Sequence, residues 1–149
     1  MLDGMLIPEV QPSDRVFVES FNKLIQLSMN ACGLRTLVGF CKLPNLKRLE
    51  LQDNKLTSIV QLTSFCKLES LKVSNNFLAT ETTLKPLAGL QKLRSIYLAG
   101  NPLCELLDHN IRVFATLPFI RNMDGISREG EDNLTDEYDQ NEEAGNDGI

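Results

Sequence analysis

The sequence has little of the side-chain chemistry on which enzymes and metal sites depend. Its 149 residues contain one histidine, His109, so any His-dependent triad or metal cluster would rest on that residue. Asp108 is its sequence neighbour and would not face it on a helix, and Cys104 is poorly spaced for a nucleophile–base pair. P-loop, GxGxxG and HExxH motifs are also missing. We therefore predict no enzyme, no cofactor and no metal site, with His109 as a surface or cap residue.

The chain also lacks paired cysteines and long apolar runs. Its four cysteines are widely spaced and form no CxxC pair, which predicts free, buried thiols: Cys32, Cys41, Cys66 and Cys104. The first ten residues have no basic region and are interrupted by polar residues and proline, unlike a signal peptide. No stretch approaches the ~18 apolar residues of a membrane span. The expected compartments are the nucleus and the cytoplasm, with no membrane contact.

Basic residues are absent after Arg128. All 15 basic residues lie in residues 1–128 against 11 acids, so this part has a net charge of +4 although the whole chain has −5. With no run of Lys or Arg, that charge is weak support for nucleic-acid binding, and none is expected. Residues 129–149 are also poor in apolar side chains, which predicts a disordered tail. The tail has nine acids: Glu129, Glu131, Asp132, Asp136, Glu137, Asp139, Glu142, Glu143 and Asp147.

What the sequence does have is leucine at regular positions. Residues 46–56, LKRLELQDNKL, follow the pattern LxxLxLxxNxL. The pattern recurs at 68–78 and 93–103, and at 24–34 with Cys32 in the asparagine position. Intervals of 22, 22 and 25 residues are typical of leucine-rich repeats. In each repeat the paired leucines point inward from a short strand, and the asparagine amide can satisfy backbone groups of the following turn.

Stacking of such repeats predicts an α/β fold, a short leucine-rich repeat solenoid with a curved parallel sheet and an irregular or 3₁₀ convex side. The predicted parts are an N-terminal cap (1–23), four repeats (24–103), a C-terminal cap (104–128) and the tail (129–149). The C-terminal cap is expected to contain a helix ended by Pro118, followed by a truncated fifth repeat. One face of that helix is predicted to be apolar: Leu106, Leu107, Ile111, Phe114 and Leu117.

The outward side chains of the strands and their following turns are expected to form a concave binding face, the usual contact surface of a solenoid. Tyr97 and Arg48 are the sharpest candidates, because tyrosine and arginine are favoured at interfaces. The alternative is that these polar side chains only keep the sheet soluble. The predicted set is Arg48, Glu50, Gln52, Asp53, Lys72, Ser74, Asn75, Tyr97 and Asn122.

Three stretches resemble the acidic leucine-rich nuclear phosphoprotein family. They are the turn at 54–59 (NKLTSI), the second repeat at 43–51 (LPNLKRLEL) and the terminal run at 111–125 (IRVFATLPFIRNMDG). The terminal run is similar to the family's C-terminal cap, a motif shared with the A-prime protein of the U2 small nuclear ribonucleoprotein and with axonemal dynein light chains. The resemblance covers about residues 21–128.

This resemblance implies a non-enzymatic, monomeric nuclear regulator that binds histones or other basic proteins, with roles in histone modification, chaperoning, phosphatase inhibition and RNA export. The tail departs from the family pattern, since it is short and contains Asn and Gly among its acids. The alternative is therefore a structural subunit of a ribonucleoprotein, similar to the A-prime protein.

Overall fold

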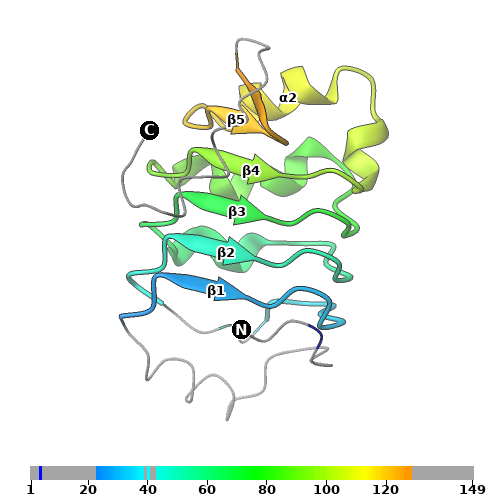
Figure 1. Ribbon diagram of the computed structural model, residues 1–149. Coiled ribbons are helices and arrows are strands. Elements are labelled where there is room, and N and C mark those ends of the chain that lie inside the picture. The colour runs from blue at the N-terminus through cyan, green and yellow to red at the C-terminus, as the bar shows by residue number, and fades with distance from the viewer. Residues whose placement is uncertain (1–3, 5–22, 39, 41–42, 129–149) are drawn as a thin grey trace.

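A computed structural model describes residues 4, 23–38, 40 and 43–128. The predicted N-terminal cap, apart from Gly4 and Lys23, and the predicted tail lie outside these residues. Short strands stack along one sheet in chain order, with the helical returns behind it and α2 at the C-terminal end (Figure 1). The strands are β1 (Gln26–Ser28), β2 (Arg48–Glu50), β3 (Ser70–Lys72), β4 (Ser95–Tyr97), β5 (Asn122–Met123) and β6 (Ile126–Ser127).

The repeat register predicted from the leucine pattern is confirmed. Neighbouring strands from β1 to β5 pair in parallel, and their central residues align: Leu27, Leu49, Leu71, Ile96 and Met123. All five side chains are buried. Since full burial of such a side chain contributes roughly 1.5–3 kcal/mol, this row makes a large contribution to the stability of the solenoid.

The asparagines of the pattern form a buried hydrogen-bonded ladder. Asn54 Oδ1 accepts from the backbone N–H groups of Cys32 (2.9 Å) and Leu34 (3.0 Å), while its Nδ2 donates to the carbonyl of Leu51 (2.9 Å). Asn76 and Asn101 repeat this arrangement one and two turns further along. Each amide thus satisfies backbone groups from its own repeat and from the preceding one, which locks the repeats together.

The convex side is built from 3₁₀ helices, as predicted. They are η1 (Val60–Ser64), η2 (Glu81–Gly89) and η3 (Pro102–Glu105). Two rows of apolar residues at three-residue spacing face the core and are buried: Ile59, Leu62 and Phe65, and Leu84, Leu87 and Leu90. Pro86 lies inside η2. A 3₁₀ helix brings every third side chain onto one face, which fits this spacing.

The cap helix α2 (His109–Thr116) is shorter than the sequence predicts, and two residues of its predicted apolar face are exposed. Leu107 is 81% and Ile111 64% exposed, whereas Val113 is fully buried. The cause is Asp108, which has a left-handed φ of 58° and so changes the direction of the backbone just before the helix. Residues before Asp108 therefore do not belong to the helix, and the 3.6-residue periodicity cannot be extended through them.

The truncated fifth repeat ends in a hairpin that the sequence analysis did not predict. After β5 the chain turns through Asp124 (φ 54°) and Gly125 (φ 84°) and returns as β6, antiparallel to β5. Positive φ at both central residues is the type I′ geometry that Asp-Gly favours. Asp124 Oδ1 accepts from the N–H groups of Leu98 (2.7 Å) and Ala99 (3.0 Å), so it covers backbone donors beyond the end of β4. The sheet is thus parallel up to β5 and antiparallel at its last pair.

The described cysteines are free, but the prediction that they are buried holds only in part. Cys32 is buried, Cys104 is half-buried and Cys66 is exposed, while Cys41 lies outside the described residues. Cys66 follows η1 on the convex side, where the chain turns back toward β3, so it lies outside the core. Burial, and secondarily the charge of Asp124, raise the pKa of the Cys104 thiol, which keeps it protonated near neutral pH.

Candidate functional site

The predicted binding face is assembled by the register of the strands. Glu50, Lys72 and Tyr97 occupy equivalent positions in β2, β3 and β4, and Arg48 lies at the start of β2 opposite Ser70. All four side chains are half-buried. Neighbouring strands of a sheet are ~4.8 Å apart, so Glu50, Lys72 and Tyr97 form one continuous row of carboxylate, ammonium and phenol groups.

The clearest contact on this face joins Lys72 and Tyr97. The Lys72 Nζ lies 5.1 Å from the centroid of the Tyr97 ring, within cation–π range. The pair orders a long cationic side chain against a rigid aromatic ring. A partner that binds here meets a preorganised surface, which lowers the conformational entropy lost on binding.

The turns after the strands carry a second set of predicted residues. Asn75 Nδ2 donates to Asp53 Oδ1 (2.8 Å), linking two exposed side chains of neighbouring repeats. The Gln52 backbone N–H donates to Asn30 Oδ1 (2.7 Å), while Asn30 Nδ2 donates to Glu50 Oε1 (3.0 Å). Asn30 is the first-repeat counterpart of Gln52, and the strand alternation of the sequence also places it on the concave face.

Two of the predicted site residues are buried. Ser74 is 9% and Asn122 8% exposed. Asn122 lies in β5 opposite both Ser95 of β4 and Ser127 of β6. These two residues therefore offer little surface to a partner, and the row of Glu50, Lys72 and Tyr97 carries the candidate site.

A hollow of about 400 Å³ lies in the C-terminal cap, between α2 and the β5–β6 hairpin. Its lining is mainly apolar and includes Ile111, Phe114, Met123 and Ile126. Arg128 closes one side, with its guanidinium carbon 4.7 Å from the centroid of the Phe114 ring. The same guanidinium donates to the carbonyl oxygens of Leu117, Phe114, Pro118 and Ile120. The sequence analysis did not single out Arg128, because nothing in a linear pattern shows which carbonyls its side chain reaches.

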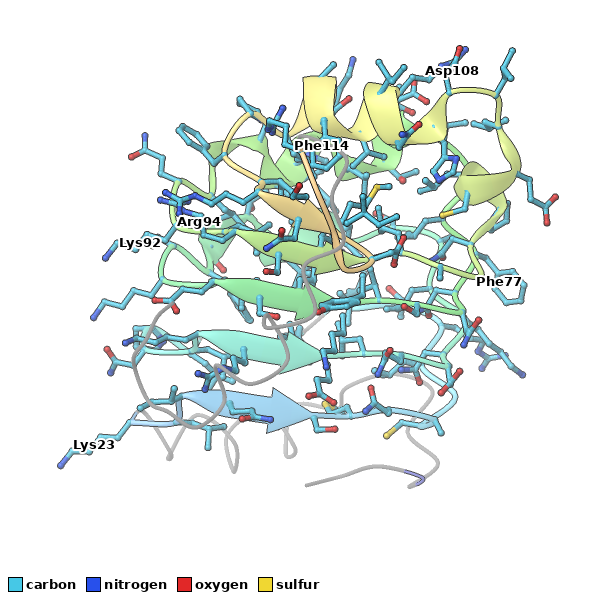
Figure 2. The ribbon with its side chains drawn as sticks, turned by 45° about the horizontal axis from the view of Figure 1, so that its top comes forward. Lys23, Phe77, Lys92, Arg94, Asp108 and Phe114 are labelled. Carbon is cyan, nitrogen blue, oxygen red and sulfur yellow. The ribbon has the colours of Figure 1, made fainter. Side chains whose placement is uncertain are left out.

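Sequence reasoning also missed a basic edge, defined here as Lys23, Lys47, Lys67, Lys92, Arg94 and Arg121. Figure 2 shows Lys23, Lys92 and Arg94 projecting from the same edge of the solenoid, where the chain enters each strand. A signal was present, because Lys precedes the first leucine of three of the four repeats, at Lys23, Lys67 and Lys92. It went unseen because these residues are 25 to 44 positions apart and form no run.

His109 is the first residue of α2, half-buried, and its backbone N–H donates to the Leu106 carbonyl (3.2 Å). In the part of the chain that the structure describes, no three His, Cys, Asp or Glu side chains gather in a way that would hold a metal ion. Among the same residues, no helix has the length and apolar character needed to cross a membrane.

The solenoid resembles a solved structure of a known repeat protein. One chain of the crystal structure of the Drosophila melanogaster SNF/U2A′ complex superposes with a TM-score of 0.72 and 21% identity, covering 94% of this chain and 80% of that chain. At this level of identity the likeness concerns the fold, a leucine-rich repeat solenoid. No protein-family model matches the chain.

The sequence relatives identify the family as well as the fold. The chain is 37% identical over 119 residues to acidic leucine-rich nuclear phosphoprotein 32 family member A of Drosophila melanogaster, which is 79% of this chain and 46% of the relative. It is 34% identical over 121 residues to the related protein 2 of Caenorhabditis elegans, 76% of this chain and 52% of the relative. The chain thus spans about half the length of these curated relatives. Over its repeat region, the chain belongs to the acidic leucine-rich nuclear phosphoprotein 32 family.

Proposed function

We propose that the chain is a non-enzymatic nuclear module that binds proteins through its concave face and basic proteins, histones among them, through its acidic tail. The observation that carries the first half is the row of Glu50, Lys72 and Tyr97, in which Lys72 Nζ is 5.1 Å from the Tyr97 ring. The family name of the relatives supports the nuclear compartment. The nine acids of residues 129–149, without a basic residue, support the second half.

The polarity of the row favours a protein partner of mixed charge. A carboxylate, an ammonium and a phenol at roughly 5 Å intervals can each accept or donate hydrogen bonds to a partner's polar groups. Tyrosine also supplies apolar contact area with few rotatable bonds, which is why it recurs at interface hot spots. Half-burial of these side chains means that they lose little conformational freedom on binding.

The test is affinity capture from nuclear extract with the full chain as bait. Recovery of core histones supports the proposal, and Tyr97→Ala with Lys72→Ala should reduce the recovery of whichever partner uses the concave face. Lys85→Ala with Thr63→Ala, two exposed positions in the convex 3₁₀ helices, is the matched control. The same eluates, assayed for inhibition of a protein phosphatase, test the regulatory role that the family resemblance implies.

A second candidate function is that of a structural subunit of a ribonucleoprotein. The observation that favours it is the superposition on a chain of the SNF/U2A′ complex over 94% of this chain. In the same capture experiment, recovery of a small RNA-binding protein together with U2 RNA, without histones, would replace the first proposal with this one.

A further inference from the structure

Six basic side chains that are distant in sequence lie together on the basic edge. The backbone shows this directly, because each residue that precedes a strand bonds to its counterpart in the preceding repeat. The Arg94 N–H donates to the Glu69 carbonyl (2.9 Å), and the Arg121 N–H to the Arg94 carbonyl (2.8 Å). Lys47 and Ile25 complete this column through bonds of the same kind.

A second column runs beside the first, two residues earlier in each repeat. It contains Lys23, Asn45, Lys67, Lys92 and Phe119. Two of its members are in direct contact, because Lys67 Nζ donates to Asn45 Oδ1 (2.9 Å), 22 residues away. The two columns hold six cationic groups and one acid, Glu69. Five of the six side chains are exposed, Arg94 being half-buried. None of the six forms an ion pair with an acid of residues 23–38, 40 and 43–128.

The described chain ends beside this edge. The backbone N–H of Arg128 donates to the carbonyl of Arg121 (2.8 Å), the last residue of the first column. The next residue, Glu129, is the first of the nine acids in the 21 residues 129–149. Four strand spacings separate Arg121 from the first repeat, roughly 19 Å. A segment of 21 residues reaches at most ~70 Å, so its length allows contact with every cation of the edge.

We infer that the acidic segment 129–149 binds the basic edge of its own chain and must be released before it binds a basic partner. Tethering gives a short flexible segment an effective concentration on the order of millimolar at a neighbouring site. Weak individual charge contacts then suffice to hold it part of the time. The sequence alone favours a tail that does not bind the repeats, because the cations of residues 1–128 are scattered along the sequence. The register of the repeats brings six of these cations together on one edge, so this reason no longer holds.

A single-stranded nucleic acid is the rival occupant of a basic groove. Such sites combine cations with aromatic side chains on which bases stack. The two columns contain Phe119 as their single aromatic, and the carboxylate of Glu69 interrupts the row of cations. Nine tethered acids next to the edge would also repel phosphates. These observations favour the acidic segment.

The first experiment compares two full-length, isotope-labelled chains by nuclear magnetic resonance. One is the natural sequence, and in the other all nine tail acids are replaced by their amides. We expect backbone amide shift differences at Lys23, Lys47, Lys67, Lys92 and Arg121 in 50 mM salt, shrinking as salt is raised. Differences that map instead to Lys72 and Tyr97, to the hollow of the cap, or to no described residue would overturn the inference.

The second experiment places the substitutions on the edge. Lys23→Gln, Lys67→Gln and Lys92→Gln together should remove most of these shift differences. Arg35→Gln, Lys55→Gln and Lys85→Gln change the charge equally at exposed positions elsewhere and should leave them intact. Equal melting temperatures show that both variants are folded. Loss of the differences in both variants, or in neither, contradicts a local site.

The third experiment tests the rival and the consequence for function. A 20-nucleotide single strand should bind the amide-tail chain more tightly than the natural chain, because the natural tail blocks the edge. Equal binding means that the tail does not occupy it and overturns the inference. If the tail is free half of the time, releasing it with the edge variant should tighten binding of a poly-lysine probe about twofold, whichever natural partner the proposed function turns out to involve.

Discussion

At the scale of single residues, the turn after each strand shows how one backbone requirement is met by different side chains. The residue before the ladder position has a left-handed φ in every repeat: 58° at Ala31, 61° at Asp53, 59° at Asn75 and 83° at Gly100. Glycine adopts this conformation without strain and aspartate and asparagine tolerate it, whereas alanine adopts it only at a cost in free energy. At Gly100 a second reason favours glycine, because a Cβ there would overlap Asn75 Oδ1 and displace that side chain.

The first prediction follows from Ala31, the one poor choice in this series. The left-handed conformation costs an alanine roughly 1–2 kcal/mol. Replacing it with glycine removes this cost, but part of the gain is lost because a glycine gives up more conformational freedom on folding. We expect Ala31→Gly to raise the free energy of unfolding by about 0.5–1 kcal/mol in urea titrations. Gly100→Ala, at the matching position, should lower it. A loss of stability in Ala31→Gly would show that the turn does not hold its left-handed residue in solution.

The second prediction concerns the asparagine ladder. Asn76 is 2% exposed, accepts from the Leu56 N–H (3.0 Å) and donates to the carbonyls of Val73 (2.9 Å) and Leu51 (3.0 Å). Asn76→Ala leaves the Leu56 N–H buried without this acceptor, which costs about 1–3 kcal/mol. The two carbonyls each keep one donor, Asn54 Nδ2 for Leu51 and Asn101 Nδ2 for Val73. This loss is a large part of the stability of a small domain, so we expect the variant to melt at a clearly lower temperature by circular dichroism. Asn110→Ala, on the exposed surface of α2, is the control and should melt normally.

At the scale of elements, the sequence predicts the repeats well and the cap poorly. The leucine positions and Asn54 were identifiable because a repeated pattern averages over local irregularities. The cap occurs once, so a single left-handed residue, Asp108, was enough to displace the predicted helix face. The β5–β6 hairpin had a readable signal in Asp124-Gly125, but an expected fifth repeat concealed it.

The third prediction tests the cap. The Arg128 guanidinium donates to the Leu117 carbonyl (2.9 Å) and to the Ile120 carbonyl (2.7 Å), and so joins the end of α2 to β6. Bonds from a charged donor are worth ~1.5–3 kcal/mol, less at an exposed position. We expect Arg128→Ala to lower the free energy of unfolding by about 1–2 kcal/mol.

The matched control for Arg128 is Arg112→Ala. Arg112 lies in α2, in the same cap, and its ion pair with Glu81 is long (3.8 Å), with the Arg112 side chain 52% exposed. Such pairs contribute ~0–1 kcal/mol, so this variant should be close to the natural chain in urea titrations. Equal destabilisation of the two variants would mean that loss of charge, and not loss of the carbonyl contacts, explains the effect.

At the scale of the whole molecule, the repeat determines where charge accumulates. The sequence shows a body of +4 and a tail of nine acids, but not their arrangement. Lys23 and Lys92 are 69 residues apart in sequence and yet lie on one edge, because every repeat returns the chain to the same register. Candidate sites built by register therefore cannot be found by scanning for local runs. The concave row was predictable, because strand alternation is itself local.

The fourth prediction concerns the tail and its basic partners. Exposed charge contacts contribute ~0–1 kcal/mol each, and nine of them acting together need only about 1.4 kcal/mol in total for a tenfold change in affinity. We expect replacement of the nine acids by amides to weaken binding of core histones at least ~tenfold in low salt and to flatten the dependence on salt, because fewer screened contacts remain. Fluorescence titrations at two ionic strengths measure both quantities. Thermal stability should be unchanged, since the buried core of the described residues is formed between Leu27 and Met123. The triple variant Lys23→Gln, Lys67→Gln and Lys92→Gln should instead bind core histones more tightly than the natural chain, because its tail is free.

If the amide-tail chain binds histones with the natural affinity and the same salt dependence, the tail is not the histone-binding element, and the function as a ribonucleoprotein subunit gains support.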